Sequence, residues 1–312
     1  MDKKLPLTWV WQNGGISAKF SICTSINISA NLNISASNPP LRQAQKRYAS
    51  FNMKRFIVIF LFPLVLHAQN VGKWRAGSSY QLIGKIYTLS CFVSGPNDEW
   101  TYNEKLEMLN LLNESQKWIS KEALKYSISV DFNESGNFGL NNDIKLPNIA
   151  RGNASGNESV DWVSKIFYKI GYKSNLDFDS WIKKNTNANN YHVIIFVKGK
   201  GNGYAMAYSS EMEKEKYYVE GAVLYEKYNG NGKLASSSIA HEILHLYGAW
   251  DLYKTFRQSE SNELKAKRLF PNSIMIRTSY NINELDIDSL SAWLVGWNKY
   301  PKEWYETFRP KE

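Results

Sequence analysis

The amino-acid sequence predicts a single mixed α/β domain over residues 69–312, preceded by a leader. Runs of β-branched and aromatic residues alternate with amphipathic segments along this part of the chain, and we find no internal repeat. Hydrophobic residues make up 43% and charged residues 21% of the 312 residues, close to globular averages. These proportions exclude a disordered or collagen-like chain, and a domain of this length can build its core without disulfides.

A signal peptide is expected at residues 53–68. Met53-Lys54-Arg55 is a short positive segment, an apolar run follows at 56–66, and Ala68 offers a small residue for cleavage. The run is too short to span a bilayer, which takes about 20 apolar residues, so no stable membrane anchor is expected. We therefore expect a secreted protein, extracellular or periplasmic.

Residues 1–52 precede this expected signal peptide. They are rich in Ser, Asn and Ile without an amphipathic period, which is typical of a disordered leader. We interpret them as an over-extended gene start, with translation beginning at Met53. The alternative is a cytoplasmic arm ahead of a signal anchor, which the short apolar run disfavours.

The net charge of +9 belongs mainly to the leader. Residues 1–68 carry eight of the 38 Lys and Arg residues but only one of the 29 acidic residues. The domain that follows is therefore nearly neutral, and no nucleic-acid partner is expected.

Five segments are expected in the first half of the domain. Residues 85–94 are β-branched and aromatic, which predicts a strand. Apolar residues spaced among charged ones over 101–125 predict a long amphipathic helix. A short strand is expected at 128–132, a loop rich in Asn and Gly at 133–157, and a helix with apolar positions over 160–170.

The second half begins with a nearly continuous apolar run at 191–197, typical of a central strand. Residues 203–209 and 217–225 predict two more strands that bracket a charged turn. A helix is expected to start near Leu234, and a last helix at 286–297.

Several residues are expected to pack in the core. Cys91 lies in an apolar run and is interpreted as a buried thiol. Trp118, Trp162 and Trp293 sit at helix-periodic positions, so core packing explains them more simply than a carbohydrate-binding surface. His192 lies in an expected strand without a ligand-spaced neighbour, and we interpret it as structural.

The chemistry-bearing residues lie in the run HEILHLYGAWD at 241–251. On a helix, His241 and His245 project from one face, one turn apart, and can bind one Zn²⁺. Glu242 can reach a metal-bound water as general base. Gly248 permits the positive-φ turn that ends the helix, so that Asp251 can return as third ligand. Three protein ligands plus water is the open arrangement of a catalytic zinc.

This run resembles the extended HExxHxxGxx(H/D) motif of the metzincin zinc metallopeptidases, in the variant that ends with Asp. The resemblance implies a zincin-like catalytic domain with a mixed sheet, an active-site helix and a Met-turn beneath the metal. Met275 in Ser273-Ile274-Met275 resembles that turn. Some metzincins carry a zinc-proximal Tyr two residues after the Met; this chain has Arg277 there, and we do not transfer the role to Tyr280.

The resemblance also implies that an edge strand above the helix pairs with an extended substrate. Residues 203–207 are the candidate, because small residues let another backbone approach. An ordinary hairpin strand is the alternative.

From the motif we expect a secreted zinc-dependent metalloendopeptidase that acts on a protein or peptide substrate. Peptide bonds would be hydrolysed through a zinc-bound water with Glu242 as general base. One catalytic Zn²⁺ would be held by His241, His245 and Asp251.

Two alternatives stay open. A gluzincin-type peptidase would take Glu260 or Glu263 as third ligand in place of Asp251, although the Gly248 turn and Met275 argue against it. A non-catalytic exported zinc-binding protein would keep the metal without hydrolysis, although it would not need the general base.

Overall fold

The structure is a computed structural model that describes residues 76–146, 156–207, 218–228 and 232–311. These residues belong to one compact unit. The expected leader and signal peptide lie outside them. The sheet and helices confirm the predicted mixed α/β domain. Within the described ranges, no helix is long and apolar enough to cross a membrane.

A mixed sheet forms the centre of the domain. Its order is β2-β1-β4-β6-β5, with the short β3 also pairing with β1. All pairings are parallel except that of β5, which runs antiparallel to β6 at the end of the sheet. The strands are β1 (Gly84–Ser94), β2 (Val130–Phe138), β3 (Ile144–Lys145), β4 (Asn190–Lys200), β5 (Tyr204–Met206) and β6 (Gly221–Lys227).

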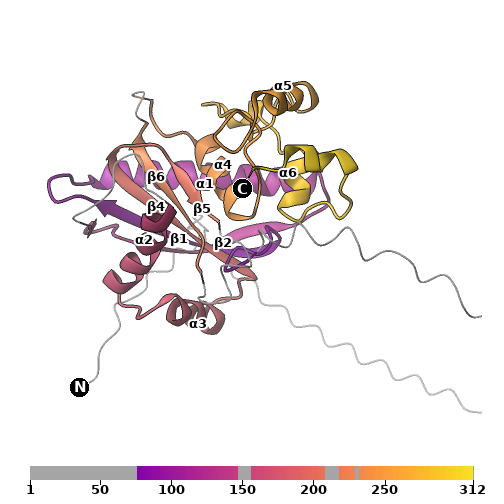
Figure 1. Cartoon of the computed structure of the whole chain (residues 1–312). Helices are drawn as coiled ribbons and strands as arrows, with labels where there is room; N and C mark the ends of the chain where they lie inside the picture. The colour runs from indigo at the N-terminus through magenta and orange to yellow at the C-terminus, as the bar shows by residue number, and fades with distance from the viewer. Residues whose placement is uncertain (1–75, 147–155, 208–217, 229–231, 312) are drawn as a thin grey trace, which may run out of the picture. The chain divides into compact units, whose positions relative to one another are not determined.

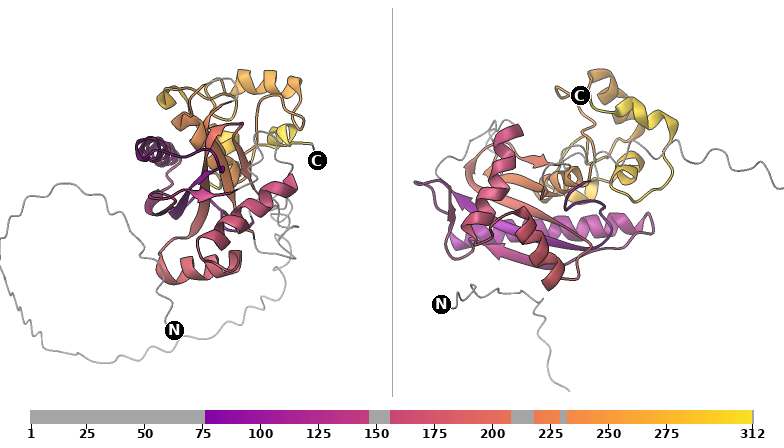
Figure 2. Two further views of the ribbon diagram at one scale, coloured as in Figure 1. Left: turned by 90° about the vertical axis from the view of Figure 1, so that its left-hand side faces the viewer. Right: turned by 60° about the horizontal axis from the view of Figure 1, so that its bottom comes forward.

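Helices cover both faces of this sheet (Figures 1 and 2). One face packs against α1 and α4, and the other against α2 and α3. The helices are α1 (Tyr102–Leu124), α2 (Gly156–Lys169), α3 (Asn175–Asn185), α4 (Ser236–Leu246), α5 (Glu260–Leu269) and α6 (Ser289–Leu294), with 3₁₀ turns η3 (Ile282–Glu284) and η4 (Glu303–Phe308).

Burial on both faces explains the continuous apolar run of β4. Ile194 and Phe196 pack in the core shared with α1 and α4, whereas Val193, Ile195 and Val197 pack in the core shared with α2 and α3. Successive side chains of a strand point to opposite faces, so a central strand covered on both sides needs apolar residues at every position. The expected central strand is confirmed.

The structure departs from the expected elements in three ways. Strand β2 extends to Phe138 and β3 follows it, inside the stretch expected to be a loop, because both pair with the edge of β1. Helices α3 and α5 were not expected; α5 buries only Ala266, so its sequence carries almost no amphipathic signal. The last helix, α6, is shorter than the expected 286–297.

The expected core residues are buried. Cys91 is fully buried, and the three tryptophans expected in the core are buried as well. His192 is also fully buried: its Nδ1 lies 3.0 Å from the Tyr247 hydroxyl and its Nε2 lies 3.3 Å from the Thr88 hydroxyl. Burial lowers the pKa of His192 to about 3. The structural interpretation of His192 is therefore confirmed.

A buried carboxyl joins the start of the described chain to the region of α4. Glu220 Oε2 accepts hydrogen bonds from the Ser78 backbone N–H and hydroxyl, both at 2.7 Å, and from the Ser79 N–H at 3.1 Å. The Ser79 side chain in turn hydrogen-bonds with Tyr247, the residue that follows α4. Burial raises the pKa of Glu220 to about 8 despite the hydrogen bonds that favour its ionised form.

We predict that Glu220 makes the protein less stable as the pH rises. The folded pKa lies above the ordinary 4.5, so the stability gained from the protonated form is complete below about 4.5 and is lost as the pH approaches about 8. Glu220→Gln removes this loss. Between these pH values, the melting temperature of the variant should fall by at least about 5 °C less than the melting temperature of the wild type. Thermal unfolding across the range measures this, with the exposed Glu303→Gln as control. Parallel curves for Glu220→Gln and wild type would contradict the prediction.

Candidate metal centre

The site is built on α4, which is tied to the rest of the domain at its first turn. The Ser115 hydroxyl of α1 donates to the Ser236 carbonyl at 2.7 Å. The Ser237 hydroxyl donates to the Ser279 carbonyl at 2.6 Å and accepts from the Ser279 N–H at 3.0 Å. These bonds position the helix between α1 and the segment that follows Met275.

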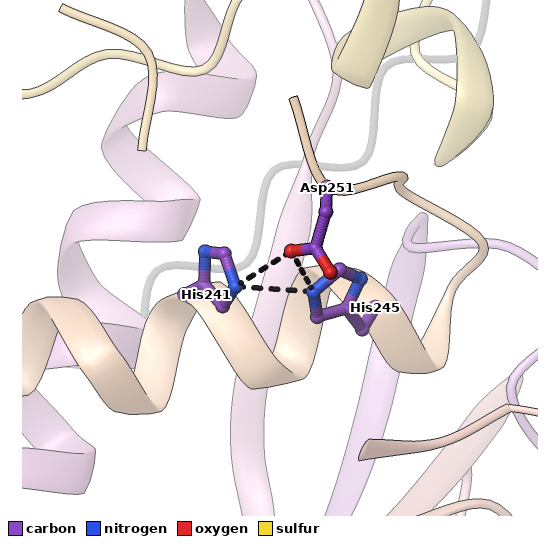
Figure 3. Close-up of side chains that lie close together, drawn as sticks. All are labelled: His241, His245 and Asp251. Atoms are coloured by element: carbon purple, nitrogen blue, oxygen red, sulfur yellow. Dashed lines mark hydrogen bonds and ion pairs between the residues drawn. The ribbon is translucent and has the colours of Figure 1, made fainter. Parts of the chain in front are cut away.

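Two imidazoles on α4 point toward the same centre (Figure 3). His241 and His245 lie one turn apart, and their Nε2 atoms are 3.0 Å apart. His241 is buried and His245 half-buried, so a bound ion would be largely shielded from water. The expected pairing of the two histidines on one helix face is confirmed.

Backbone carbonyls orient both rings. His241 Nδ1 donates to the Ile274 carbonyl at 2.9 Å, and His245 Nδ1 donates to the Ala249 carbonyl at 2.7 Å. A carbonyl can only accept, so both Nδ1 atoms carry protons and Nε2 is left as the ligand atom. Hydrogen bonds from the ring nitrogen that does not bind the metal fix the tautomer of metal-binding histidines.

The chain turns back to the histidines at Gly248. This glycine has φ +94, a left-handed conformation that side chains rarely adopt, and its N–H donates to the His245 carbonyl at 2.9 Å. Three residues later the Asp251 carboxylate faces both rings: its Oδ1 lies 3.0 Å from His245 Nε2 and 3.3 Å from His241 Nε2. The expected helix-ending turn is confirmed.

The charges of these groups are strongly coupled. Burial opposes ionisation of Asp251, but the adjacent His245 and His241 outweigh it and hold the pKa of Asp251 well below its usual range. Burial disfavours the imidazolium form of His245, yet the Asp251 carboxylate overcomes this effect and raises the pKa of His245 to about 9. The carboxylate thus favours positive charge at the centre, as a metal ion would supply.

The three ligand atoms fit a single metal ion. They are separated by 3.0–3.3 Å. Atoms that share a tetrahedral zinc at about 2.0–2.1 Å lie about 3.3 Å from one another. Within the described residues, His241, His245 and Asp251 are the group of side chains placed to hold a metal. Two imidazoles and one carboxylate also suit other divalent transition metals, so the geometry by itself does not select zinc.

Glu242 lies beside the candidate metal ligands on a cavity of about 300 Å³ that His241 also lines. Burial raises the pKa of Glu242, and the two histidines act in the opposite direction. Gly203 faces the same carboxylate: a Cβ at that position would lie 3.7 Å from Glu242 Oε1. The cavity thus places the Glu242 carboxylate, and space for a reacting group, next to the candidate ligands.

Met275 lies in a tight turn beside the ligand helix. It is fully buried, its carbonyl accepts from the Leu252 N–H at 2.9 Å, and the preceding Ile274 supplies the carbonyl that orients His241. The side chain of Ser273 braces the turn by donating to Asp288 at 2.6 Å. The turn that contains Met275 is thus tied to α4 through the carbonyl of Ile274.

The alternative third ligands both lie on α5, where each forms an ion pair with a lysine. Glu263 accepts from the Lys254 N–H at 2.7 Å and pairs with Lys267. Glu260 pairs with the Lys254 ammonium at 3.0 Å. Neither glutamate belongs to the group that could hold a metal, which favours Asp251 as third ligand.

Sequence reasoning missed Tyr253 at the site. This residue lines the cavity, its side chain hydrogen-bonds with Asp251, and its ring centroid lies 6.2 Å from that of His241. Burial raises the pKa of Tyr253, so its hydroxyl stays a neutral donor at physiological pH. Of the two residues considered for the zinc-proximal Tyr position, Tyr280 is exposed and Arg277 lines the cavity. Tyr253 lies two residues beyond Asp251, on the segment that returns to the histidines, and this proximity in the sequence is the signal that could have found it.

The candidate substrate strand lies where it was expected. Tyr204–Met206 forms β5, the antiparallel strand at the end of the sheet, and it packs beside α4. Among the described strands, β5 pairs with β6 and no other strand.

No protein-family model and no curated protein matches this chain.

Proposed function

We propose that the protein is a zinc-dependent metalloendopeptidase of the metzincin type. The observation that carries this proposal is the convergence of His241, His245 and Asp251 within 3.0–3.3 Å, with Glu242 beside them on an open cavity. A structural metal site would be closed by four protein ligands, whereas three leave a position for water.

The residues of the chain divide the chemistry between them. A zinc ion at this centre would polarise the scissile carbonyl and lower the pKa of its water ligand. Glu242 accepts the proton of the attacking water and passes it to the leaving amine. Burial raises the pKa of Glu242, which makes its carboxylate a stronger proton acceptor in this role.

Tyr253 and β5 support the reaction from two sides. The Tyr253 hydroxyl donates its one proton to the Asp251 carboxylate and so holds this ligand in place. We propose that β5, at the end of the sheet, binds the substrate backbone as an added strand, and that Gly203 keeps the space beside Glu242 clear.

We also infer that the protein acts outside the cytoplasm. The basis is the expected signal peptide at 53–68, which would direct export of residues 69–312.

Metal analysis combined with a cleavage assay tests the proposed function. The purified protein should contain one zinc per chain and cleave casein or a peptide library, and a chelator should abolish cleavage until zinc is restored. Zinc-loaded protein that cleaves no peptide would favour the non-catalytic alternative. Protein that cleaves peptides equally well with and without chelator would overturn the metal mechanism.

We predict that Tyr253→Phe lowers kcat by about 10–100-fold, the usual cost of removing an outer-shell partner of a metal ligand. Kinetics and zinc titration should be measured together, because the variant loses the hydrogen bond that holds the Asp251 carboxylate in place. Tyr280→Phe is the matched control, since its side chain is 71% exposed. Equal kcat for Tyr253→Phe and the control would remove Tyr253 from the site.

A further inference from the structure

The cavity beside Glu242 has a cationic wall. Arg277, two residues beyond the buried Met275, lines this cavity together with Glu242 and His241. The turn places it there: the Arg277 N–H donates to the Ser273 carbonyl at 3.4 Å. The residue is exposed and belongs to the cavity lining, which leaves its guanidinium free to turn toward a bound ligand.

Arg277 differs in its ion pairing from the lysines on and next to α5. Lys254 and Lys267 are engaged by the carboxylates of Glu260 and Glu263. No ion pair within the described part of the chain involves Arg277. A guanidinium on a cavity wall without a protein carboxylate is suited to a carboxylate of the ligand.

The neighbouring walls supply neutral hydrogen-bonding groups. Ser238 and Thr278 carry hydroxyls, and the Tyr228 side chain hydrogen-bonds with Ser238. Ile276 is an apolar member of the lining, against which the methylene groups of an acidic side chain can pack. Hydroxyls beside a guanidinium form an environment that stabilises a carboxylate.

We propose that this cavity receives the side chain of an Asp or Glu residue flanking the scissile bond, and that Arg277 gives the peptidase its preference for that acidic residue. The proposal rests on the proposed function. Because Glu242 is an acid in the same cavity, a second carboxylate would be repelled without a cation on the wall. Arg277 is therefore the specificity-determining residue.

Matched peptides test the proposal. Quenched fluorescent peptides carry Glu, Gln, Asp, Asn or Lys at one position on either side of the cleaved bond, and mass spectrometry of the products assigns the bond. At one of the flanking positions, kcat/KM should be about tenfold higher for Glu than for Gln and for Asp than for Asn, and lowest for Lys.

Variants assign the preference to Arg277. Arg277→Ala should reduce the Glu-to-Gln ratio toward one, Arg277→Lys should retain part of it, and Arg277→Glu should reverse it in favour of Lys. Arg268→Ala removes an exposed arginine of α5 outside the cavity lining and should leave the ratio unchanged.

The outcomes separate this proposal from the proposed function. Cleavage of Gln and Glu peptides at equal rates, or a preference for apolar residues at that position, would overturn the acidic specificity and leave the peptidase assignment standing. A preference for Glu that persists in Arg277→Ala would show that another group confers it. Failure of the metal-loaded protein to cleave any peptide would overturn both.

Discussion

Glu242→Gln should retain the metal and lose hydrolysis by about 10²–10⁴-fold, the usual contribution of general-base catalysis. The amide has nearly the shape of the carboxylate, so the cavity and the three ligands stay in place, but it cannot accept the proton of the attacking water. Steady-state kcat with a peptide substrate and zinc content per chain are the two measurements.

The exposed Glu303→Gln serves as the charge-matched control and should have wild-type kcat. Wild-type hydrolysis by Glu242→Gln with a full complement of zinc would remove Glu242 from the role of general base. Loss of zinc from Glu242→Gln would show instead that Glu242 contributes to metal binding.

Asp251→Ala should weaken zinc binding by more than about 100-fold. Loss of an outer-shell partner alone costs about 10–100-fold, and here one of three direct ligands is removed. The same change removes the carboxylate that lies 3.0 Å from His245 Nε2. Zinc titration with a competing chelator measures the change, and peptide hydrolysis should fall in parallel.

Three further variants complete this test. Asp251→His should retain zinc, because an imidazole can serve as third ligand. Glu260→Ala and Glu263→Ala should bind zinc like wild type, since both glutamates are paired with lysines. Normal zinc binding by Asp251→Ala combined with loss in either glutamate variant would make the protein a gluzincin-type peptidase.

Local patterns predicted the parts of the fold in which one stretch of sequence carries its own signal. The helix α1 and the central strand β4 were expected close to their observed bounds because their apolar residues follow a period or fill a run. The predicted strand at 128–132 ended too early, because the Asn and Gly residues that follow suggest a loop. Only pairing with β1 makes this segment part of β2. Helix α5 was missed since it buries so little.

The sequence by itself determined the spacing of the candidate ligands. His241 and His245 share a helix face through their four-residue separation, and Gly248 allows the chain to turn back toward them. Tertiary structure decided what surrounds them: Ile274 orients His241, and Gly203 and Arg277 lie on the Glu242 cavity. These residues come from segments distant along the chain, so no local period relates them to the motif; only the packing of the loops around α4 and β5 brings them together.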